Sequence, residues 1–401
     1  MYKPLITIII PCIRTIFIKN CIRSLLLQDE KILRQTEIIL ILNFKDKKKI
    51  NLSEIFKDFA PEEKKIVKKI KIIKEIYTKK FLNMRDNWEF SIKFITGRWT
   101  LFLCDDDALI PSALKILYKF ISKKKYDVIC FDLNCIEYDH TNNILKYNPK
   151  QIHEFSEREF DSSNYINKVV NLLDIISFGL KRDLPYFPKV LCSTEIIKKN
   201  KPFFISHDAM TSSFFSLLNG TKKFLKINKS LLVVGDDSES LSSVFMRNRQ
   251  LWNTHLSNNL SQFTNVYLKD LKNFEHSRFS ISYFFNLVHV ASKKFNYKIL
   301  NINKHISYFL IGICKEAIRR NNLVFRDNAF DYKREIYKIY YYCFKKYNIF
   351  IFLFFIFKIE TYRFLETCKR FKKLFLREKI INMRFNNIYE AVKYLKKPLL
   401  K

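Results

Sequence analysis

Three adjacent carboxylates, Asp105, Asp106 and Asp107, follow the uncharged segment TLFLC at 100–104. Carboxylates this close raise one another's pKa unless a cation neutralises them. Oxygen ligands suit Mg²⁺ or Mn²⁺, which take one or two carboxylates together with the phosphates of a substrate. The triplet therefore favours a divalent metal site that faces a phosphorylated ligand. The structural alternative is an acidic loop that caps the following helix and faces water.

Alternating strands and helices would position these aspartates. Buried strands are expected at 5–10, 37–43, 98–104 and 126–134, and helices at 16–28, 85–97 and 111–124. The first two strands are continuous apolar runs, which is typical of strands covered on both faces. Pro111 opens one helix and Gly97 ends another. The alternation predicts a doubly wound, mainly parallel α/β sheet, in which ligands bind beyond the carboxyl ends of the strands.

The rest of the chain has a weaker pattern. The high Ile and Val content of 65–76 favours a strand. A helix is expected at 207–220, ended by Gly220, and two short strands within 222–240. From about 245, long helices with Tyr and Phe interleaved with Lys and Arg are expected. We therefore expect two regions, 1–245 and 246–401.

Charge and cysteine content narrow the class of protein. The chain has 72 Lys and Arg against 39 Asp and Glu, a net charge of +33. Residues 251–401 hold 29 basic and 10 acidic residues, so an excess of 19 lies in that stretch. An anionic partner is expected. The nine Cys include no C-x-x-C pair, which argues against a disulfide framework or a zinc site, and the N-terminal apolar run is too short for a signal peptide. We therefore expect a cytoplasmic protein.

Three segments together resemble the N-terminal half of a family 2 glycosyltransferase with the GT-A fold. They are TIIIPCIRTIFIKNCIRSLLLQ (7–28), EIILILN (37–43) and NMRDNWEFSIKFITGRWTLFLCDDDALIPSAL (83–114). The resemblance covers residues 4–120, is fainter over 180–240, and ends there. It implies a Rossmann-like, mixed and mainly parallel sheet flanked by helices, with a basic α-helical C-terminal region. It also implies a D-x-D motif at which a divalent cation, Mn²⁺ or Mg²⁺, meets the diphosphate of a nucleotide sugar.

The resemblance assigns roles to individual residues. Asp107 would bind the metal, Asp105 would contact the metal or the ribose, and Asp106 would belong to the nucleotide-sugar site without a settled role. Further nucleotide-sugar contacts are expected from Pro11, Arg14, Asn43 and Asn87. The turn after the first strand reads PCIRT where the family commonly has a Tyr, and Asn43 stands where it commonly has an Asp. These departures leave the base of the nucleotide open.

Inverting sugar transfer needs a general base for the hydroxyl of the acceptor. The segment from His207 resembles the part of the family in which an acidic residue opens a helix, which makes Asp208 the candidate base. The alternative role of Asp208 is a helix cap. Asp236 or Asp237 could be the base instead, although a solvated turn is the plainer interpretation of GDDSES (235–240). His207 is interpreted as a hydrogen-bonding neighbour, because no second His lies at ligand spacing.

The basic, aromatic tail has three competing interpretations. It could be a helical domain packed on the catalytic core, a surface that lies on an anionic membrane, or a nucleic-acid site. Its longest apolar run, 349–357, is too short to span a bilayer. Nucleic-acid binding is disfavoured because no recognised module is present. Peripheral attachment to the inner face of the cell membrane would suit a saccharide or lipid-linked acceptor.

The resemblance implies a role in assembling a bacterial surface polysaccharide, such as capsule or lipooligosaccharide. Two alternatives stay open. One is a metal-dependent nucleotidyltransferase, although no glycine-rich opening loop with a Lys is present. The other is a non-catalytic, membrane-associated scaffold with a degenerate GT-A fold, which would bind neither metal nor nucleotide.

Overall fold

The computed structural model describes residues 4–43, 55–69, 72–123, 125–132, 136–148, 155–170, 184–206, 209–236, 280–299 and 381–396, with scattered residues between 306 and 364. The chain divides into two compact units. The first comprises 1–166, 181–243 and 379–401, and the second comprises 167–180 and 244–378. The last residues of the chain thus belong to the first unit, whereas the sequence placed them in a separate C-terminal region.

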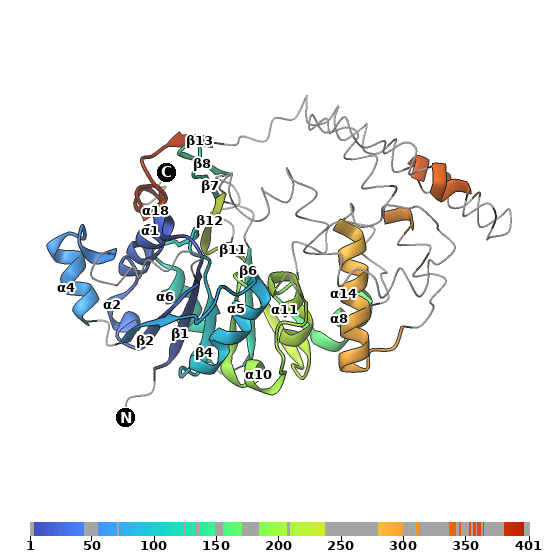
Figure 1. The fold of residues 1–401 in the computed structure, drawn as a ribbon, viewed down its shortest axis with the longest axis horizontal. Coiled ribbons are helices and arrows are strands. Elements are labelled where there is room, and N and C mark those ends of the chain that lie inside the picture. The colour runs from blue at the N-terminus through green and yellow to red at the C-terminus, as the bar shows by residue number, and fades with distance from the viewer. Residues whose placement is uncertain are drawn as a thin grey trace. The chain divides into compact units, whose positions relative to one another are not determined.

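An eight-stranded sheet forms the centre of the first unit (Figure 1). Its order is β3-β2-β1-β4-β10-β6-β11-β9. Pairing is parallel from β3 to β4 and between β6 and β11, and antiparallel at β10 and β9, so the sheet is mixed and mainly parallel, as predicted. The strands are β1 Ile6–Cys12, β2 Thr36–Leu42, β3 Ile72–Tyr77, β4 Trp99–Phe102, β6 Val128–Asp132, β9 Glu157–Asp161, β10 Val190–Ser193 and β11 Lys223–Ser230.

Helices flank this sheet (Figure 1). They are α1 Thr15–Leu26, α2 Glu30–Leu33, α4 Pro61–Lys69, α5 Met84–Ser91 with a 3-10 turn Ile92–Phe94, α6 Ala113–Ile121, α10 Thr194–Lys199 and α11 Ala209–Leu218. A further helix, α8 Ser162–Val170, begins in the first unit and ends in the second. The expected end of a helix at Gly220 is present, since Gly220 has a φ of +83° in the left-handed region that favours glycine.

The expected strand at 65–76 is only half a strand. Its first part is the end of α4, and the strand β3 begins at Ile72. Pro61 begins the helix, and Glu62 and Glu63 lie in its first turn. A proline at the first helical position and acidic residues next to it both stabilise a helix N-terminus, and here they outweigh the β-branched content that follows.

A second sheet of five strands was not anticipated. Its order is β13-β8-β7-β12-β5, and its strands are β5 Ala108–Leu109, β7 Ile136–Asp139, β8 Ile144–Tyr147, β12 Leu232–Asp236 and β13 Ile381–Arg384. The edge strand β13 comes from the end of the chain and pairs antiparallel with β8. The helix that follows, α18 (Ile388–Lys396), contacts α1, β5 and β12. The C-terminal segment therefore completes the sheet that carries β5.

A buried carboxylate joins strands at the amino-terminal edge of the main sheet. The side chain of Glu37 is fully buried and accepts hydrogen bonds from the hydroxyl of Thr7, from the amide and hydroxyl of Thr96 at 2.9 and 2.7 Å, and from the amide of Gly97 at 3.1 Å. A Cβ at Gly97 would lie 2.6 Å from Oγ1 of Thr7, so this approach requires glycine. Burial opposes ionisation, yet these hydrogen bonds lower the pKa of Glu37.

In the second unit, the structure describes one continuous helix, α14 (Ser280–Phe295), and scattered helical residues between 306 and 364. None of the described helices combines the length and the apolar character needed to cross a bilayer.

Candidate active site

The aspartate triplet lies at the carboxyl edge of the main sheet, immediately after β4. The amide of Leu103 still bonds to the carbonyl of Ile9 on β1, at 2.9 Å, and the chain then turns. The amide of Asp107 donates to the carbonyl of Cys104 at 3.2 Å, which closes the turn before β5. All three carboxylates are buried, with exposed fractions of 3, 8 and 3%. Buried carboxylates need hydrogen bonds or a cation. The turn is therefore not an acidic helix cap that faces water.

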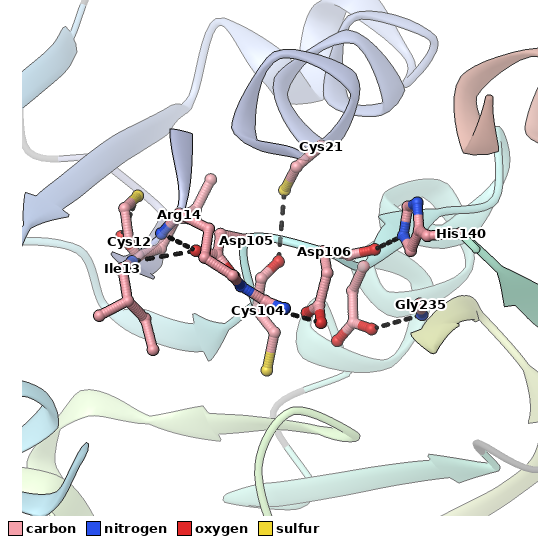
Figure 2. A network of polar contacts seen from close by, with 11 residues as sticks. Cys12, Ile13, Arg14, Cys21, Cys104, Asp105, Asp106, His140 and Gly235 are labelled. Atoms are coloured by element: carbon pink, nitrogen blue, oxygen red, sulfur yellow. Dashed lines mark hydrogen bonds and ion pairs between the residues drawn. The ribbon is translucent and has the colours of Figure 1, made fainter. Parts of the chain in front are cut away.

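Asp105 is held by the turn that follows β1. Its Oδ2 accepts from the backbone amides of Ile13 and Arg14, each at 3.0 Å, and its Oδ1 accepts from Nη2 of Arg14 at 3.1 Å (Figure 2). Burial and the charge of Asp106 raise the pKa of Asp105, whereas Arg14 lowers it. Both oxygens of Asp105 are therefore used to join the ends of β1 and β4.

Asp106 is held through both its side chain and its main chain. Its Oδ2 accepts from Nη2 of Arg14 at 2.6 Å, and its carbonyl oxygen lies 3.0 Å from Nε2 of His140. A carbonyl can only accept, so Nε2 of His140 carries the proton. Burial opposes the charge of Arg14, but Asp106 and Asp105 outweigh it and raise the pKa of Arg14. Phe17 contacts both partners, with its ring 4.3 Å from that of His140 and 4.9 Å from the guanidinium carbon of Arg14.

Asp107 depends on a glycine far along the chain. Its Oδ1 accepts from the amide of Gly235 at 3.0 Å (Figure 2). Burial, and then the charge of Asp106, raise the pKa of Asp107 well above its ordinary value. A Cβ at Gly235 would lie 2.0 Å from the carbonyl oxygen of Asp106 and 2.7 Å from Nε2 of His140, so only glycine fits. The sequence did not assign a role to Gly235 or His140, although a glycine in a chain with only five was a usable signal.

One group of donor atoms among the described residues fits a metal ion. The thiol of Cys104 and the carboxylates of Asp106 and Asp107 offer ligand atoms within 4.8 Å of one another. Asp105, one of the two metal ligands expected from the sequence, lies outside this group. With all three aspartates ionised and Arg14 as the cation of this network, the net charge is −2. A divalent cation would balance that charge, so the donor set and the charge both suit one.

The structure also describes the three other residues, Pro11, Asn43 and Asn87, for which the sequence predicted a nucleotide contact. Pro11 is buried in β1, opposite Ile41. Asn43 is buried, and its carboxamide bonds to the amide and carbonyl of Leu82, each at 2.8 Å, which ties that segment to the end of β2. Asn87, on α5, is 2% exposed, and its Oδ1 accepts no hydrogen bond from the described residues. Asn87 is thus a buried acceptor open to a ligand donor, whereas Asn43 is bound to protein.

The candidate general bases are only partly described. Asp208, its neighbour His207, and Asp237 lie outside the described residues. Asp236 is exposed at the end of β12, where its backbone lies opposite that of Asp139 at the end of β7. The assignment of the base therefore stays a prediction.

Comparison with known proteins gives one family and several similar folds. Residues 7–179 match the family described as glycosyl transferase family 2. No curated protein matches the chain. Among solved structures, S. aureus TarS 1-349 has a TM-score of 0.45 and 12% identity, with 86% of this chain and 92% of that chain covered. The same protein in complex with UDP-GlcNAc has a TM-score of 0.44 and 13% identity, with 86% and 93% covered.

A mannosyltransferase from Pyrobaculum calidifontis, in complex with GDP-Man and Mn²⁺, has a TM-score of 0.40 and 9% identity, with 73% of this chain and 74% of that chain covered. The family match includes β1, β4 and the aspartate turn, whereas β12, which carries Gly235, lies outside it. Residues 7–179 thus match glycosyl transferase family 2, and the sheet that carries the aspartates is mixed and mainly parallel, as expected of the GT-A fold.

Proposed function

We propose that the protein is an inverting glycosyltransferase that moves a sugar from a nucleoside diphosphate sugar to a saccharide or lipid-linked acceptor. The observation that supports this most directly is the group of three buried carboxylates at the carboxyl edge of a family 2 sheet, where α/β folds bind their ligands. We place the reaction in the assembly of a bacterial capsule or lipooligosaccharide. A cytoplasmic protein attached to the inner face of the membrane through its basic second unit would meet such an acceptor.

The protein's own residues prepare the site for a charged leaving group. Asp106 and Asp107 would hold the divalent cation, Mn²⁺ or Mg²⁺, which supplies positive charge to the diphosphate as it leaves. Arg14 fixes the carboxylates of Asp105 and Asp106, and Gly235 fixes that of Asp107. Because these groups are fixed before substrate arrives, little reorganisation is needed during the reaction.

The acceptor hydroxyl must lose its proton as it attacks the anomeric carbon from the face opposite the nucleotide. We propose Asp208 for this step, with Asp236 and Asp237 as the alternatives. Asn87, whose buried Oδ1 accepts no bond from the described residues, would accept a hydrogen bond from the donor nucleotide sugar.

Calorimetric titration of UDP, GDP and CMP, with and without Mn²⁺, tests the donor site. We expect one nucleotide to bind in a metal-dependent manner. Replacing Asp107 by Asn should weaken that binding at least about 100-fold, because it removes a charged metal ligand. Asp127→Asn is the matched control, since Asp127 is an exposed carboxylate that precedes β6 at the opposite edge of the sheet. If folded wild-type protein binds no nucleotide under either condition, the scaffold alternative replaces this proposal.

A further inference from the structure

We propose that Cys104 is a third protein ligand of the divalent cation, beside Asp106 and Asp107, and that its sulfur makes the site prefer a softer ion such as Co²⁺ to Mg²⁺. The inference rests on the proposed function, since it concerns the metal of that site. It adds a ligand type that the aspartate motif does not contain.

The three donor atoms lie close enough to reach one ion. An ion that lies about 2.3 Å from a sulfur and about 2.1 Å from an oxygen, with angles of about 90–110° between its ligands, holds donors about 3.0–3.6 Å apart. The ligand atoms of the three residues all lie within 4.8 Å of one another. Side-chain rotations that move the donor atoms by about 1–2 Å at most therefore bring all three onto one ion.

The backbone of Cys104 is held in place by hydrogen bonds. Its carbonyl accepts from the amide of Asp107 at 3.2 Å and from Sγ of Cys21 at 3.5 Å (Figure 2). Leu103, which precedes it, is still bonded to β1. The thiol thus projects from a rigid turn and not from a loose loop, and a ligand that is held in place before the metal arrives binds it more tightly.

Cys104 differs in burial from the other cysteines that the structure describes in the first unit. Cys12, Cys21, Cys130 and Cys192 are fully buried, as expected of small apolar core residues. Cys104 is partly exposed and lies among carboxylates. The thiol of Cys104 already forms a hydrogen bond with the carboxylate of Asp107, so its sulfur lies beside a proposed metal ligand.

The chemistry gives the selectivity. Carboxylates alone suit Mg²⁺, whereas a thiolate binds it poorly and favours softer ions. When the ion binds, a metal–sulfur bond forms and the S–H bond breaks. The proton passes to solvent, and neither the sulfur nor the metal changes oxidation state.

Cobalt titration of the full-length protein tests the proposal without an activity assay. Co²⁺ bound to a thiolate has a near-ultraviolet charge-transfer absorption that Co²⁺ bound only to oxygen lacks. We expect this band in the wild type and its loss in Cys104→Ser. The variant should still bind Co²⁺ through its carboxylates, and its preference for Co²⁺ over Mg²⁺ should fall about 10-fold or more.

Cys21→Ser is the matched control, because Sγ of Cys21 bonds to the carbonyl oxygen of Cys104 but lies outside the group of three metal donors. It should keep the band. If Cys104→Ser does not fold, as judged by circular dichroism, Cys104→Ala takes its place. A band that persists without the Cys104 sulfur, or an unchanged ion preference, would overturn the inference.

The same titration distinguishes a failure of the Cys104 inference from a failure of the proposed function. If Co²⁺ binds the wild type without the band, Cys104 is not a ligand, and the proposed function stands. If folded wild type binds no divalent cation at all, with or without UDP, both the inference and the metal site of the proposed function are wrong.

Discussion

Replacing Gly235 by alanine should disable the donor site without unfolding the protein. The new Cβ would lie 2.0 Å from the carbonyl oxygen of Asp106, a main-chain atom, and 2.7 Å from Nε2 of His140. A contact above 3.0 Å requires a displacement of at least about 1 Å. That displacement would break the hydrogen bond from the Gly235 amide to Asp107, which has a length of 3.0 Å.

The size of the effect follows from the lost hydrogen bond. Loss of a hydrogen bond to a charged group costs about 1.5–3 kcal/mol, and 100-fold corresponds to about 2.8 kcal/mol. We therefore expect the affinity of Gly235→Ala for the bound nucleotide, measured by calorimetry with Mn²⁺ and the UDP, GDP and CMP panel, to fall about 100-fold.

Gly220→Ala is the matched control. Gly220 has a φ of +83°, and the nearest atom to a Cβ there is Nζ of Lys199 at 3.5 Å, so the variant meets strain but no clash. It should lose about 1 kcal/mol of stability, a decrease in Tm of about 2–4 °C, and bind nucleotide normally. Wild-type nucleotide affinity in a folded Gly235→Ala variant would refute the assigned role of Gly235.

Two further substitutions test the structure around the site. Hydrogen bonds from Thr7 and Thr96 outweigh burial and lower the pKa of Glu37 in the folded protein. The ionised carboxylate therefore stabilises the fold fully above the unfolded pKa of about 4.3, and this stabilisation is lost as the pH falls through the lower folded pKa. Urea unfolding should show Glu37→Gln less stable than wild type by about 1.5–3 kcal/mol at pH 7, with a gap that narrows below about pH 4; a gap independent of pH would contradict this. The hydroxyl of Tyr138 lies 2.9 Å from the carbonyl of Phe385, so Tyr138→Phe should cost about 1 kcal/mol and speed amide hydrogen exchange in β13 about 5-fold, and unchanged exchange would show that this contact does not hold the strand.

The sequence alone determined four strands of the central sheet, β1, β2, β4 and β6, and the place of the aspartates. The runs in β1 and β2 are apolar at every position because parallel strands are covered on both faces, and this pattern can be read within seven residues. The position of the triplet directly after an apolar strand was equally local. Together with the neighbouring segments, it was enough to indicate the family and the GT-A fold.

Local sequence patterns predicted the secondary structure wrongly in two segments. The 65–76 segment is rich in Ile and Val, but Pro61 and the acidic turn after it start a helix that runs to Lys69. The C-terminal residues gave no hint of β13, because an edge strand of four residues has too short a pattern to recognise.

Only the tertiary structure shows that the three aspartates differ in their contacts. Arg14 and Asp105 are 91 residues apart, and Gly235 and Asp107 are 128 apart, so no local pattern links them. The sheet brings the ends of β1 and β4 together, and both carboxylate oxygens of Asp105 accept hydrogen bonds that join them. β12 then places Gly235 against Asp107, which leaves Asp106 and Asp107 beside Cys104. The composition of a strand depends on the burial of each of its positions, which is a local property. The hydrogen bonds between polar groups depend on which distant segments lie next to one another, and the packing of the whole unit decides that.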